Sequence, residues 1–175
     1  MRILLGILVL CVTSMASANI VFSPSFSYMT EEQENAGTTT AEYTKSFYDF
    51  RLGYLAASGL YLGGMYSMSS YDDGSYNQKG FAVGPTVGYS HYAGFYALFT
   101  YFLMAELKVD STNTLTDGMG PQVDIGWAFP LTSSFHIGPQ ITYRSITFDK
   151  LDPGAVSVEI TQTDLVPAIN LWFNF

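Results

Sequence analysis

The chain has 175 residues, of which 48% are hydrophobic, 16% aromatic and only 13% charged, and its formal net charge is −8. A soluble domain has about 25% charged residues, so this composition is typical of a protein that contacts lipid. The acidic balance excludes most nucleic-acid binders, which need a basic face. Beyond the N-terminal region, no segment approaches the roughly 18 consecutive apolar residues of a membrane-spanning helix. A membrane protein without such helices must be a closed β-barrel, because only that structure also pairs every backbone group.

The N-terminal residues predict a secretory signal peptide over residues 1–18. Arg2 supplies an early positive charge, and the apolar run Ile3–Val12 follows it. An A-x-A cleavage pattern then occurs at Ala16-Ser17-Ala18. A membrane-spanning helix is the alternative, but the run is shorter than the roughly 20 residues that a span needs.

A lipoprotein signal is rejected because Leu10 is not small and Cys11 lies inside the apolar run. Cleavage would leave residues 19–175 as one domain. That domain would contain no cysteine, which excludes disulfides, thiolate metal sites and cysteine catalysis.

Eight segments with a period of two follow in chain order. In each of them apolar residues occupy one face and small or polar residues the other, which is the pattern of a β-strand. Their lengths match the roughly 9–11 residues of a transmembrane strand. The segments cover about residues 20–30, 44–54, 60–69, 81–90, 95–109, 119–129, 135–147 and 165–175.

The connections between these segments alternate in length. Short connections follow the second, fourth and sixth segments, and long polar connections follow the others. The long ones cover about Glu31–Tyr43, Ser70–Gly80, Asp110–Gly118 and Phe148–Asp164. This alternation predicts an all-β fold, an eight-stranded antiparallel transmembrane β-barrel with short periplasmic turns and longer extracellular loops.

The charged residues within the segments all fall on the polar face in this pattern. An Arg or Lys facing lipid near the midplane costs about 2–4 kcal/mol, so the polar face is predicted to line the interior. An eight-stranded interior is just wide enough for side chains, and buried polar groups there need partners. We therefore expect a lumen polar network, with a gated pathway for ions or small solutes as the alternative. Its predicted members are Asp49, Arg51, Glu106, Lys108, Gln122, Asp124, Gln140, Arg144 and Asn170.

The last strand places Leu171, Phe173 and Phe175 on its apolar face. With the signal peptide and the eight alternating segments, this terminus resembles the small outer-membrane β-barrel superfamily, whose members include the OmpA membrane domain and OmpX-like and OmpW-like proteins. The resemblance covers residues 19–175. It implies a Gram-negative outer-membrane location, lipid and lipopolysaccharide as partners, and these three residues as the signal read by the barrel-assembly machinery.

Function is less closely defined by the pattern, since members of that superfamily differ widely in role. His91 and His136 have no nearby serine and acid that form a nucleophile with its base. We expect no catalytic residue, no cofactor and no metal. The favoured hypothesis is a monomeric, non-enzymatic barrel with a structural or surface-interaction role. The alternatives are a porin-like narrow channel, as in OmpW-like proteins, and, more remotely, a lipid A-modifying enzyme.

Overall fold

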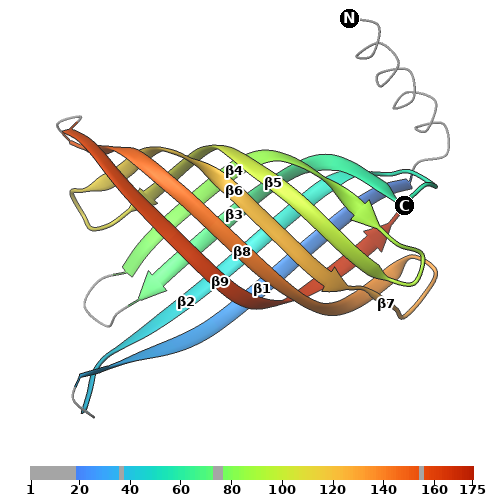
Figure 1. Ribbon diagram of the computed structural model, residues 1–175, viewed down its shortest axis with the longest axis horizontal. Helices are drawn as coiled ribbons and strands as arrows, with labels where there is room; N and C mark the ends of the chain where they lie inside the picture. The colour runs from blue at the N-terminus through green and yellow to red at the C-terminus, as the bar shows by residue number, and fades with distance from the viewer. Residues whose placement is uncertain (1–18, 36–37, 73–76, 154–155) are drawn as a thin grey trace, which may run out of the picture.

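The computed structural model describes residues 19–35, 38–72, 77–153 and 156–175. They form one antiparallel sheet that closes on itself as a barrel (Figure 1). The predicted signal peptide, residues 1–18, lies outside the described residues. Within the described ranges, no helix is long and apolar enough to cross a bilayer.

Nine strands make up this sheet, and eight of them form the barrel wall. β7 has only two residues and continues β6 past Ala128, because Gly126 pairs with Gln140 and Phe129 pairs with Ile137 in the same register along β8. The predicted eight-stranded barrel is therefore confirmed. The strands are β1 (Asn19–Asn35), β2 (Thr38–Leu55), β3 (Leu60–Asp72), β4 (Asn77–Ser90), β5 (Phe95–Lys108), β6 (Thr114–Trp127), β7 (Phe129–Pro130), β8 (Phe135–Asp152) and β9 (Val156–Asn174).

The first strand, β1, pairs with the last strand, β9, and this pairing closes the barrel. The pairing runs from Val21 opposite Asn174 to Phe26 opposite Ile169. Phe175 adds to it through its backbone, since its N–H donates to the Ile20 carbonyl at 2.9 Å and its carbonyl accepts from the Ile20 N–H at 3.2 Å. Closure leaves no strand edge along this part of the wall, as a bilayer requires.

Tight turns join the strands at one end of the barrel, which we call the turn end. The described turns cover residues 56–59, 91–94 and 131–134, as predicted. Gly59 and Gly94 have φ angles of 88° and 97°, which glycine adopts without the steric penalty of a Cβ.

The opposite end, the hairpin end, differs from the sequence-based expectation. Segments predicted as long loops are largely strand, because β1 and β2 continue to Asn35 and from Thr38, and β8 and β9 continue to Asp152 and from Val156. Pairing these polar segments satisfies their backbone donors and acceptors with each other. The two hairpins extend past the rest of the wall and diverge from one another (Figure 1).

An apolar belt covers the outward face of the wall. Leu52, Ile125, Ile141 and Ile169 on it are about half exposed or more, at 61%, 49%, 59% and 56%. Contiguous apolar surface of this kind is unusual on a soluble monomer and favourable against lipid. Aromatic rings such as Trp127 gather near the turn end, where they suit the headgroup level.

A β-bulge interrupts the alternation in β5. Leu103 and Met104 are consecutive and both exposed, whereas Phe102 and Ala105 on either side of them are buried. The register with β6 shifts between Phe102 and Ala105. An extra residue in one strand reverses which face each later side chain takes.

The bulge makes the predicted positions of Glu106 and Lys108 wrong. Lys108 is exposed and Glu106 is only partly buried on the outward side, while Leu107 is 6% exposed and points into the barrel. Strict alternation from Phe95 predicted the reverse. Beyond the bulge, therefore, an apolar side chain replaces two charges inside the barrel.

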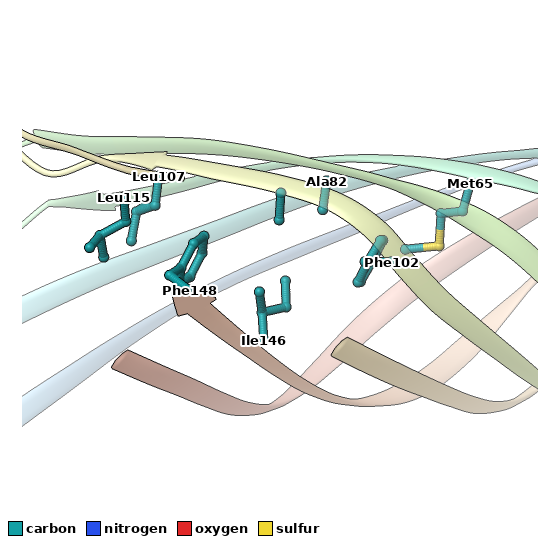
Figure 2. Packing of buried hydrophobic residues seen from close by; sticks show 8 residues of the cluster. Met65, Ala82, Phe102, Leu107, Leu115, Ile146 and Phe148 are labelled. Atoms are coloured by element: carbon teal, nitrogen blue, oxygen red, sulfur yellow. The ribbon is translucent and has the colours of Figure 1, made fainter. Parts of the chain in front are cut away.

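Two apolar clusters occupy the barrel interior. The hairpin-end cluster contains Met65, Ala82, Phe102, Ala105, Leu107, Leu115, Ile146 and Phe148. Figure 2 shows these side chains pointing toward one another from facing parts of the wall. The turn-end cluster contains Val21, Tyr61, Tyr96, Leu98, Ala128 and Trp172.

Candidate functional site: a polar layer inside the barrel

Between the two apolar clusters lies a layer of charged and amide side chains. β2 supplies Asp49 and Arg51, β6 supplies Gln122 and Asp124, and β8 supplies Arg144. The alternation of each strand turns these side chains inward. Arg51, Gln122 and Asp124 have no exposed surface, so the layer fills the barrel at this height.

Two ion pairs cross the layer. An Arg51 terminal nitrogen lies 2.8 Å from Asp124 Oδ2, and an Arg144 terminal nitrogen lies 2.8 Å from Asp49 Oδ1. Arg51 also approaches Asp49 Oδ2 at 3.6 Å. The four groups are formally neutral as a set, which is the condition under which buried charges are tolerated.

Gln122 connects the two ion pairs. Its Nε2 donates to Asp49 Oδ2 at 3.0 Å and to Asp124 Oδ1 at 2.9 Å, and its Oε1 accepts from Arg144 Nε at 2.7 Å. Arg144 is further held by two rings, since its guanidinium carbon lies 4.8 Å from the Phe47 ring centroid and 5.4 Å from that of Phe102. These contacts join the polar layer to the hairpin-end cluster.

A chain of hydrogen bonds extends the layer toward the turn end. Ser23 Oγ donates to Asn170 Oδ1 at 2.8 Å, and Asn170 Nδ2 donates to the Tyr96 hydroxyl at 2.8 Å. The hydroxyl donates to Gln140 Oε1 at 3.0 Å, and Gln140 Nε2 donates to Asp124 Oδ1 at 3.0 Å. Tyr96 thus belongs to both the polar layer and the turn-end cluster.

Seven of the nine residues predicted for the lumen lie in this layer, and Glu106 and Lys108 do not. Sequence reasoning missed Tyr96, Ser67 and Thr142, which donate to Gln140, Asp49 and Asp124 respectively. Their inward alternation was readable in the sequence. Their hydrogen bonds were not, because the partners lie on other strands.

The two histidines lie at the turn end, away from the polar layer. Both border a cavity of about 540 Å³ between the turns. His91 Nδ1 accepts from the Ala93 N–H at 3.2 Å, and His136 Nδ1 is buried without a hydrogen-bond partner. Across the described ranges, His, Cys, Asp and Glu form no group of three that could hold a metal ion.

The predicted assembly residues lie on β9 and directly after it. Phe173 stacks between Phe135 and Phe22, with ring centroids 4.8 and 6.3 Å away. Leu171 is partly buried and pairs with Ile137. Phe175 is 76% exposed, so its ring is available to lipid or to a partner.

Comparisons with known proteins find solved structures with a similar fold and no relative by sequence. No family model matches the chain, and no curated protein matches it in sequence. The crystal structure of Neisserial surface protein A superposes with a TM-score of 0.53, at 13% identity, over 91% of this chain and 99% of that one. The outer-membrane protein AlkL, solved in lipid bilayers, covers 91% of this chain and 90% of its own, at 14% identity and a TM-score of 0.45.

The likeness to Neisserial surface protein A concerns the fold alone. The environment of the barrel is inferred from the distribution of its apolar and charged side chains. The wall is closed, its outward face carries an apolar belt, and the charges of the polar layer, Asp49, Arg51, Asp124 and Arg144, are buried inside. A bilayer is the solvent that this distribution requires. In its fold, the chain is similar to small outer-membrane β-barrel proteins such as Neisserial surface protein A.

Proposed function

We propose that the protein is a monomeric, non-enzymatic outer-membrane barrel that does not conduct ions and that has a structural or surface-interaction role. The filled interior carries this proposal. Arg51 and Asp124 pair across it with no exposed surface, and apolar clusters lie on both sides of them. A permeating ion would lose its hydration at each cluster without gaining an equivalent partner.

Support for a non-enzymatic role comes from the chemistry of the polar layer. Its carboxylates are already paired with arginines, and the hydroxyls of Ser67, Thr142 and Tyr96 donate to Asp49, Asp124 and Gln140. A nucleophile needs a free base beside it. In the part of the chain that the structure describes, neither histidine hydrogen-bonds to a serine.

Lipopolysaccharide is the proposed partner at the hairpin end of the belt. Lys79 on β4 and Lys108 on β5 are directly opposite each other in the register, and both are exposed. Two like charges in this relation repel, and an anionic phosphate between them would offset that repulsion. Glu106 lies near them on the same face. We further propose that the assembly machinery reads Leu171, Phe173 and Phe175.

Conductance in planar bilayers tests the proposal. We expect no steady current from the purified barrel, or a very small one. Arg51→Gln and Lys108→Gln remove one positive charge each, the first inside the polar layer and the second on the outer face. A steady, ion-selective current that changes with Arg51→Gln but not with Lys108→Gln would replace the proposal with a narrow channel.

A further inference from the structure

The hairpin end of the barrel opens into a cavity of about 490 Å³, which we call the mouth cavity. Its walls come from β4, β5, β6, β8, β9 and the connection between β5 and β6. Among the lining residues that the structure describes, six are apolar, four are polar and uncharged, and none is charged. They are Gln78, Leu107, Val109, Asn113, Leu115, Phe148, Leu151, Ile160, Thr161 and Gln162.

Two local departures from regular strand geometry create this apolar lining. The bulge at Leu103 and Met104 turns Leu107 inward. In β6, Asp117 has a φ angle of 54°, and the successive buried positions Leu115 and Gly118 are three residues apart instead of two. Both departures place a leucine inside and a charged residue outside.

The mouth cavity has a closed floor. Leu107, Leu115 and Phe148 are only 6%, 5% and 3% exposed, and they belong to the hairpin-end cluster. The polar layer lies beneath that cluster. Ile160 on the wall is 43% exposed, so it presents apolar surface toward the opening.

We propose that the mouth cavity binds an uncharged apolar molecule with an alkyl chain. Its volume lies within the roughly 300–1,000 Å³ of ligand pockets, which are mostly apolar with a few polar groups. Gln78, Asn113 and Gln162 supply such groups. A charged ligand would lose hydration there without an ion-pair partner, and the net charge of −8 repels anions.

This inference rests on the proposed surface-interaction role and names the chemical class of its ligand. The closed floor makes the cavity a binding site and not an entrance to a pathway. The two proposals can be contradicted separately. A steady current would contradict the non-conducting role, whereas absence of ligand binding would contradict only the assignment of the mouth cavity as a binding site.

Methyl NMR of the barrel in lipid nanodiscs tests the inference with decan-1-ol as the probe. We expect saturable shifts of the Leu107, Leu115 and Ile160 methyl signals. The lipid-facing Ile125 and Ile141 should show only small changes that do not saturate, because they report the alcohol dissolved in lipid. Saturation at lipid-facing methyls with none in the cavity would overturn the proposal.

Charge and lining are tested in the same titration. Decanoate at neutral pH should bind at least tenfold more weakly than decan-1-ol, and equal affinity would overturn the assignment of an uncharged ligand. Val109→Asn should weaken decan-1-ol binding at least tenfold. Met104→Gln is the matched control, since Met104 lies on the same part of the wall but is 49% exposed on its outer face. Equal affinities for the two variants would contradict the site.

Discussion

At the residue scale, the interior of this barrel depends on charge neutrality. Two arginines and two aspartates lie within one layer, and each ion-pair contact among them joins an arginine nitrogen to an aspartate oxygen. One donor, Arg51 Nε, remains buried without a partner. Since unpaired buried charges are far more costly than paired ones, the pairs are expected to couple strongly.

Arg51→Ala or Asp124→Ala alone should lower the free energy of unfolding by about 3–5 kcal/mol, because each leaves its partner charge uncompensated. The double variant should lose less than the sum of the two, since neither charge is then stranded. Urea unfolding of the purified barrel in micelles measures all three losses.

The exposed ion pair between Lys150 and Asp117, 2.6 Å long, supplies the control. Lys150→Ala should leave the unfolding midpoint unchanged, because solvent screens an exposed pair. Strictly additive losses for Arg51 and Asp124 would mean that the two residues do not interact.

At the scale of elements, single extra residues decide what the barrel encloses. The β5 bulge moves Glu106 and Lys108 outward and brings Leu107 inward. Without it, two charges would line the hairpin end and the mouth cavity would be polar. Bulges of this kind re-aim side chains without changing strand order.

Cysteine labelling tests directly which face of the wall each side chain takes beyond the bulge. Glu106→Cys should react quickly with a water-soluble maleimide in the folded barrel, and Leu107→Cys should react at least tenfold more slowly, because its side chain is packed against Phe148 and Leu115 in the hairpin-end cluster. Lys108→Cys is the exposed reference. The opposite order of rates would restore the regular alternation and remove the bulge.

At the scale of the whole molecule, closure depends on the last residues of the chain. Phe175 forms two backbone hydrogen bonds with Ile20, and Phe173 packs its ring between Phe22 and Phe135. The terminus therefore has a structural role in the wall, apart from any role in assembly.

Two variants separate these roles. Deleting Phe175 removes the backbone bonds and the ring, so folding into detergent should be impaired, as measured by the heat-dependent mobility shift of the barrel on gels. Phe175→Ala keeps the backbone bonds and should fold in detergent like the unchanged chain, yet accumulate poorly in the outer membrane of cells. Normal accumulation of Phe175→Ala would contradict the proposed assembly signal.

The sequence alone determined the closed barrel, its eight wall strands and the inward direction of Asp49, Arg51, Gln122 and Asp124. It did so because strand alternation is local and lipid excludes charge. The tertiary structure decided what alternation cannot encode: the bulge that moves Glu106 and Lys108, the pairing of Arg51 with Asp124, and the apolar clusters above and below the polar layer. These depend on register between strands distant in sequence, where one inserted residue reverses every later side chain.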